Sequence, residues 1–128
     1  MDSLAPNIFT DNMNDTLAFY KLLGFETVMS MPDNGEDLIW AMMANGSVTF
    51  MFQTFASLGE ELPQISRKDG GSLLFYINIK GIRQFFENIK DKVTVLKGLK
   101  KAFYGPVEFS ILDNNGYVLT FAEDEQGD

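Results

Sequence analysis

A chain of 128 residues with 45% hydrophobic and 13% aromatic side chains is long enough to fold as one domain around an apolar core. Its net charge of -8 argues against nucleic-acid partners, which require a basic surface. The absence of cysteine and histidine excludes disulfides, cysteine nucleophiles and metal sites built on thiolate or imidazole. No apolar run approaches the roughly 20 residues that span a bilayer, and no signal pattern opens the chain, so we expect a cytoplasmic protein without a membrane partner.

The first half of the chain has the pattern of a strand, a helix and three further strands. Residues 5–10 are extended, because Pro6 disfavours a helical conformation in the residue before it. Asn12 is a candidate cap for a helix that runs to about Leu23 and stops at Gly24. The three following strands are separated by turn-forming residues, and they are predicted over 25–31, 38–43 and 48–53, with a PDNG turn at 32–35.

The second half repeats this order after a connection at 54–71, in which one helical turn is expected around 58–62. A strand is predicted over 72–79. Apolar residues at helical spacing predict an amphipathic helix from Ile82 to Ile89. Three more strands complete the pattern, and they are predicted over 93–96, 107–112 and 117–122.

The turn before the last predicted strand is the clearest hairpin signal in the chain. Asp113-Asn114-Asn115-Gly116 combines residues that tolerate the positive φ of a tight turn. In the strand that follows, Leu119 lies on one face and Thr120 on the other. Thr120 is therefore a small hydroxyl in the middle of a strand, on a face that carries no other residue suited to chemistry.

The repeated order predicts an α+β fold of tandem βαβββ modules, with two curved sheets around a shared cleft and the helices on the outer faces. Module 1 spans about 4–53 and module 2 about 72–123, with the connection at 54–71 between them. A ferredoxin-like sandwich is the rival architecture. It is disfavoured because each predicted helix is followed by three strands rather than by a single hairpin.

Two segments carry a resemblance to a known family. The segment NIFTDNMNDTLAFYKLLGFETV resembles the opening of vicinal oxygen chelate proteins, the superfamily of glyoxalase I, extradiol dioxygenases and bleomycin-resistance proteins. The segment YGPVEFSILDNNGYVLTF resembles their closing segment, with Asn114 and Asn115 where the family often has Pro and Asp. The resemblance covers about Leu4 to Glu123, and it implies a glyoxalase/bleomycin-resistance-type fold.

The resemblance also implies where a divalent metal would be held, since family enzymes use two ligands from each module. Counting along the matched motifs places these positions at Ala5, at Phe50 or Met51, at Leu74 and at Thr120. Thr120 then stands where the metal enzymes carry a glutamate. Because these side chains offer almost no oxygen or nitrogen donors, we expect neither a family-type metal site nor a metal cofactor.

A metal-free active site would need a carboxylate, tyrosine or lysine in the cleft. Glu108 and Glu123 are the candidates, and we interpret both as solvated carboxylates at strand edges. Ser110 lacks a histidine to activate it. No catalytic residue is therefore assigned.

A binding cleft has better support in the sequence. Aromatic side chains predicted on strands and loops suit capture of a planar or partly apolar ligand, with ordinary core packing as the alternative for each of them. The residues expected to bind the ligand are Trp40, Phe50, Phe52, Tyr76, Tyr104 and Thr120. Trp40 and Tyr104 are the first choices for stacking, and the absence of arginine from this set favours a neutral or cationic aromatic molecule.

The sequence therefore predicts a metal-free protein of this family that binds a small organic ligand between its modules and forms a homodimer. Two alternatives stay open. One is a lactoylglutathione-lyase-like or other superfamily enzyme with an altered metal site. The other is a non-catalytic interaction module with a filled cleft. The enzyme is the first of these alternatives, but catalysis is less favoured than ligand binding, and no cofactor is expected.

Overall fold

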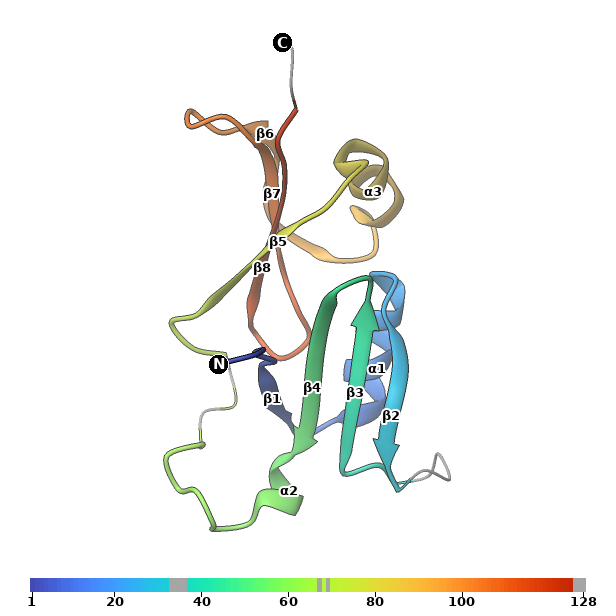
Figure 1. Cartoon of the computed structure of the whole chain (residues 1–128), viewed down its shortest axis with the longest axis vertical. Coiled ribbons are helices and arrows are strands. Elements are labelled where there is room, and N and C mark those ends of the chain that lie inside the picture. The colour runs from blue at the N-terminus through green and yellow to red at the C-terminus, as the bar shows by residue number, and fades with distance from the viewer. Residues whose placement is uncertain (33–36, 67, 69, 126–128) are drawn as a thin grey trace. The chain divides into compact units, whose positions relative to one another are not determined.

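The computed structural model describes residues 1–32, 37–66, 68 and 70–125. The chain divides into two compact units, a first unit over Met1–Lys68 and a second unit over Asp69–Asp128. Each unit carries one four-stranded sheet, and the strands follow the same order in both (Figure 1). The fold is therefore a mixed α+β fold of two βαβββ modules, as the repeated pattern predicts.

The first unit contains the elements β1 (Asn7–Thr10), α1 (Met13–Leu22), β2 (Glu26–Met31), β3 (Trp40–Asn45), β4 (Val48–Thr54) and α2 (Phe55–Leu58). Its strands lie in the order β1-β4-β3-β2, with β1 parallel to β4 and the remaining pairs antiparallel. As predicted, Asn12 caps α1, and its side chain accepts a hydrogen bond from the Asp15 backbone N–H at 2.9 Å. Gly24 follows the helix with a φ of 100°, a conformation that side chains disfavour.

An aromatic cluster fills the space between α1 and the first sheet. Tyr20 is fully buried, and its ring centroid lies 5.3 Å from that of Phe50 and 4.8 Å from that of Phe52. Phe25 packs on the same rings, 5.6 Å from Phe50. Since side chains alternate along a strand, even-numbered residues of β4 face the helix and odd-numbered ones face away.

The second unit repeats this topology with the elements β5 (Leu74–Asn78), α3 (Ile82–Ile89), β6 (Thr94–Lys101), β7 (Val107–Leu112) and β8 (Val118–Glu123). Its strands lie in the order β5-β8-β7-β6, with β5 parallel to β8 and the other pairs antiparallel. The predicted turn between β7 and β8 is confirmed. The buried Asp113 carboxylate accepts hydrogen bonds from the backbone N–H groups of Asn115 and Tyr117, both at 2.8 Å.

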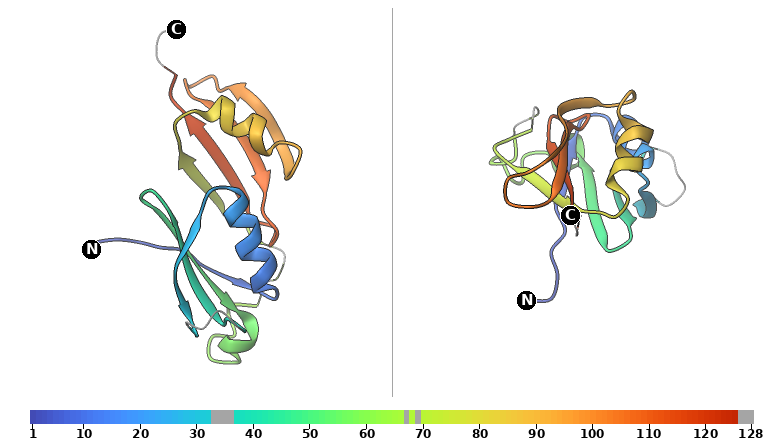
Figure 2. Two further views of the ribbon diagram at one scale, coloured as in Figure 1. Left: turned by 90° about the vertical axis from the view of Figure 1, so that its right-hand side faces the viewer. Right: turned by 90° about the horizontal axis from the view of Figure 1, so that it is seen from above.

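Helix α3 covers one face of the second sheet (Figure 2). The Phe85 ring lies 5.0 Å from that of Phe121, and the Phe86 ring lies 4.9 Å from that of Phe109. These contacts place Phe109 and Phe121 on the helix side of β7 and β8. The opposite face of those strands is therefore the one that side chains at 108, 110, 118, 120 and 122 occupy.

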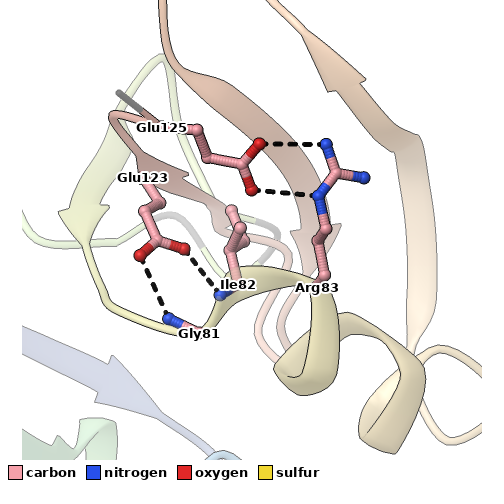
Figure 3. A network of polar contacts seen from close by, with 5 residues as sticks. All are labelled: Gly81, Ile82, Arg83, Glu123 and Glu125. Carbon is pink, nitrogen blue, oxygen red and sulfur yellow. Dashed lines mark hydrogen bonds and ion pairs between the residues drawn. The ribbon is translucent and has the colours of Figure 1, made fainter. Parts of the chain in front are cut away.

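The N-terminus of α3 is capped from outside the helix. Gly81 occupies the capping position and has no side chain to accept a hydrogen bond. The Glu123 carboxylate accepts instead, from the N–H groups of Gly81 at 3.2 Å and Ile82 at 2.9 Å (Figure 3). Two residues further on, Glu125 forms a bidentate ion pair with Arg83. Glu123, interpreted from the sequence as a solvated carboxylate, is half-buried at the end of β8 and has a capping role that the sequence did not predict.

Two predicted elements have different bounds in the structure. The helical turn expected at 58–62 lies at Phe55–Leu58, because the Thr54 hydroxyl accepts from the Ser57 N–H at 3.2 Å and starts the helix directly after β4. Strand β6 extends to Lys101 rather than ending at 96, since an edge strand tolerates lysines that face solvent.

The remaining strands agree with their predicted positions to within about two residues. Part of the predicted turn at 32–35 lies outside the described residues. In the described part of the chain, no helix is long and apolar enough to cross a membrane.

Candidate functional site

The face of the second sheet that points away from α3 carries small side chains in its two middle strands. Thr120 on β8 pairs with Ser110 on β7, and both are buried. Their hydroxyl oxygens lie 2.8 Å apart and share a hydrogen bond. Because neither side chain is large, this part of the sheet forms a low floor between the edge strands.

Larger side chains from the edge strands rise around this floor and enclose a pocket of about 350 Å³. Its apolar lining consists of Leu74, Leu96 and Val118. Its polar and charged lining consists of Tyr76, Lys97, Tyr104, Glu108, Ser110 and Thr120. An irregularity in the pairing of β6 with β7 between residues 95 and 97 accompanies the presence of both Leu96 and Lys97 in the lining.

Two tyrosines converge on one carboxylate at this pocket. Tyr76 lies on β5, Glu108 on β7, and Tyr104 in the loop between β6 and β7. The Tyr76 hydroxyl donates a short hydrogen bond to Oε2 of Glu108, and the Tyr104 hydroxyl donates to the same oxygen at 2.6 Å. We call these three residues the Tyr–Glu–Tyr cluster. Thr120 lies between β5 and β7 in the sheet, and its small side chain leaves the Tyr76 ring room to reach across.

The cluster fixes the protonation of its phenols. The hydrogen bond to Glu108 raises the pKa of Tyr76 well above its ordinary value, with smaller contributions from burial and from the carboxylate charge. The same hydrogen bond raises the pKa of Tyr104. Both phenols therefore stay protonated near neutral pH, where they act as hydrogen-bond donors rather than as bases.

The positions at which the family resemblance implies metal ligands do not form a donor set. Ala5 precedes β1, Phe50 is buried under α1, and Leu74 is an apolar wall of the pocket. Thr120 supplies the set's one side-chain oxygen, and that oxygen is bonded to Ser110. Hard divalent cations require several oxygen or nitrogen ligands, so these residues do not fit such an ion.

The structure brings together half of the residues predicted to bind a ligand. Tyr76, Tyr104 and Thr120 all line the pocket of the second unit. Phe50 and Phe52 are 2% and 0% exposed and pack against Tyr20, so the alternative of core packing describes them.

Trp40 is partly buried on β3, where it pairs with Gln53 on the face of the first sheet opposite α1, outside this pocket. The pocket also contains residues that the sequence argument had not placed in it, namely Leu96, Lys97, Glu108 and Ser110. Glu108 was interpreted as a solvated edge carboxylate, and its two phenol partners correct that interpretation. The available signal was its alternation with Phe109, because a strand that buries Phe109 under α3 must turn Glu108 to the pocket face.

The family described as Glyoxalase/Bleomycin resistance protein/Dioxygenase superfamily matches residues 2–121. No curated protein matches the chain in sequence.

Solved structures share the fold at low sequence identity. A protein of unknown function from Agrobacterium tumefaciens str. C58 superposes with a TM-score of 0.78 at 22% identity, covering 98% of this chain and 95% of the other. A bleomycin-binding protein complexed with bleomycin has a TM-score of 0.66 at 19% identity, with coverages of 98% and 100%. A bleomycin resistance determinant encoded on the transposon Tn5 has a TM-score of 0.66 at 20% identity, with coverages of 98% and 99%.

Proposed function

Because the chain belongs to the glyoxalase/bleomycin resistance protein/dioxygenase superfamily, we propose that it binds a small organic molecule in the pocket of its second unit and does so without a metal. Two proteins of similar fold are described by their binding of, or resistance to, bleomycin, which is consistent with ligand binding as a use of this fold. The observation that carries the proposal is the pocket itself, in which apolar walls surround a small number of convergent polar groups.

The chemistry of the Tyr–Glu–Tyr cluster favours binding over catalysis. A general base needs an oxygen that gives up its existing hydrogen bonds readily and takes a proton. Here both phenols hold their protons, and Glu108 already accepts two hydrogen bonds at Oε2. Such an arrangement holds a carboxylate in one place, which suits it to orient a bound molecule.

The metal-dependent reactions of the superfamily are not part of this proposal, since the donor set at the expected ligand positions does not fit a divalent cation. Within the described residues there is also no group of three or more acidic side chains close enough to hold a metal ion. A filled cleft is the less favoured alternative, because the second unit contains an open pocket of about 350 Å³. A homodimer in the cytoplasm stays a prediction, and size-exclusion chromatography with light scattering tests its first part.

The proposal is tested by closing the pocket and leaving its surroundings intact. Leu74 lines the pocket and is 50% exposed, so Leu74→Trp introduces a large ring at its wall. Leu73 is 53% exposed, immediately precedes β5 and does not line the pocket, so Leu73→Trp is a matched control.

A library of about a thousand small organic fragments is screened against the wild-type protein by ligand-observed NMR. We expect hits that are lost with Leu74→Trp and retained with Leu73→Trp, with both variants folded by circular dichroism. Hits that bind both variants equally, or a complete absence of hits, contradict the proposal.

A further inference from the structure

The two oxygens of the Glu108 carboxylate have different surroundings. Oε2 accepts from both phenols of the Tyr–Glu–Tyr cluster. Oε1 accepts no hydrogen bond from any residue that the structure describes, although Glu108 lines the pocket. An ionised carboxylate offers about four lone-pair positions, of which the phenols use two. The pocket thus presents a fixed negative charge with acceptor capacity left over.

The aromatic rings around this charge suit a cationic group. Tyr76 and Tyr104 are 47% and 59% exposed and line the same pocket as the carboxylate to which they are bonded. Aromatic faces attract ammonium groups, and the carbons next to an ammonium nitrogen pack well on a phenol ring. A neutral hydroxyl gains a weaker hydrogen bond from the same carboxylate, because hydrogen bonds between two charged groups are the stronger kind.

The position of Lys97 limits how much positive charge the pocket accepts. Lys97 is directly opposite Ser110 in the register of β6 and β7, and Glu108 is two residues from Ser110 on the same face. In the described part of the chain, Lys97 forms no ion pair and is the one cationic side chain of the pocket lining. A second positive charge on the ligand would therefore lie near the lysine ammonium and be repelled.

We propose that the ligand of this pocket is a small monoamine, in which one protonated amino group donates to Oε1 of Glu108 and an apolar body lies against Leu74, Leu96 and Val118. This inference rests on the proposed function, because it assigns a chemical class to the molecule that the same pocket binds. It narrows the expected ligands from neutral or cationic molecules to those with a single ammonium group. A pocket of about 350 Å³ limits that molecule to the lower end of ligand sizes.

Four probes that share one ring and differ in their end groups separate the contribution of the ammonium charge from that of the apolar ring. They are 4-methylbenzylamine, 4-methylbenzyl alcohol, 4-methylbenzoic acid and the diamine p-xylylenediamine. Dissociation constants are measured at pH 7 by protein-observed NMR, and binding in the pocket is defined by its loss in Leu74→Trp. We expect the monoamine to bind about tenfold more tightly than the alcohol, because a charged donor replaces a neutral one at the carboxylate. The diamine is expected to bind no more tightly than the monoamine.

Variants test whether Glu108 causes this preference. Glu108→Gln keeps the shape and removes the charge, so the monoamine should lose its tenfold advantage over the alcohol. Glu60→Gln is the control, because it makes the same change of net charge at an exposed residue of the first unit. Tyr104→Phe keeps the ring and frees a lone pair on Glu108, so monoamine affinity should stay equal or rise.

The possible results show whether the assignment of an amine or the proposed function is at fault. If the alcohol and the acid bind in the pocket as tightly as the monoamine, the assignment of an amine is wrong and the proposed function stands. The assignment also fails if the monoamine keeps its advantage in Glu108→Gln. If none of the four probes binds the pocket at millimolar concentration while the fragment screen gives hits that Leu74→Trp abolishes, the assignment of an amine is wrong and the proposed function stands.

Discussion

Removing the Glu123 side chain should weaken the start of α3 more than any other change in the C-terminal segment. The Glu123 carboxylate is the acceptor for two backbone N–H groups, those of Gly81 at 3.2 Å and Ile82 at 2.9 Å (Figure 3). Ile82 is fully buried, so its backbone has little access to a replacement water. Gly81 cannot compensate, because it has no side chain.

The size of the effect follows from these two bonds. A hydrogen bond to a charged group contributes about 1.5–3 kcal/mol when strong, and the longer bond to Gly81 contributes less. Loss of a helix cap by itself costs about 1 kcal/mol. We therefore expect Glu123→Ala to lower the free energy of unfolding of the second unit by about 2 kcal/mol. Glu123→Gln keeps an acceptor oxygen but loses the charge at the positive end of the helix dipole, which costs about 0.5–1 kcal/mol.

Amide hydrogen exchange measured by NMR is the direct assay, because two units of one chain need not unfold together. A loss of about 2 kcal/mol corresponds to about thirtyfold faster exchange at Phe85, whose N–H donates to the Gly81 carbonyl at 3.0 Å. Glu125→Gln is the control on the same segment, because its ion pair with Arg83 is solvent-exposed and should contribute little. Unchanged exchange at Phe85 in Glu123→Ala would refute the capping argument.

Three further results are expected. The Tyr76 and Tyr104 phenols should both ionise above pH 10 in ¹³C NMR titrations, with the larger rise in pKa at Tyr76. The stability that their hydrogen bonds contribute should be present below pH 10 and lost as the pH rises through their folded-state pKa values. Glu108→Gln should return both pKa values toward about 10, and unchanged values would show that Glu108 is not the cause. Calorimetric titration with Zn²⁺, Ni²⁺, Mn²⁺ or Fe²⁺ should show no stoichiometric tight site, and a single cation that shifts the Thr120 resonances would revive the enzyme alternative. Trp40→Phe should leave ligand affinity unchanged, since Trp40 is outside the pocket, whereas a tenfold loss would place the ligand on the first sheet.

The element order could be predicted from the sequence because local signals agree with the final packing. The spacing of Ile82, Phe85, Phe86 and Ile89 sets both the length of α3 and the face that packs on the sheet. Asn12 and the turn at 113–116 make the local hydrogen bonds that their side chains favour. The prediction placed helix α2 too far along the chain, at 58–62 instead of Phe55–Leu58. The Thr54 cap at its start is a weaker sequence signal than the apolar residues that follow.

The site was predicted only in part, because its residues depend on which face of each strand is buried. Phe50 and Phe52 look like pocket aromatics until Tyr20 on α1 is seen to pack on both of them. Glu108 looks like a surface carboxylate, since its partners Tyr76 and Tyr104 come from another strand and from a loop. Contacts between segments far apart in the sequence leave no local pattern, so only the structure reveals the Tyr–Glu–Tyr cluster.

The most direct test of the account is to map where a bound fragment perturbs the backbone amides of the isotope-labelled wild-type protein. We expect the largest chemical-shift changes during a titration to fall on Tyr76, Glu108 and Thr120, the residues that meet at the pocket of the second unit. Changes centred on Trp40 and the face of the first sheet opposite α1, with the pocket residues unmoved, would contradict the proposed site.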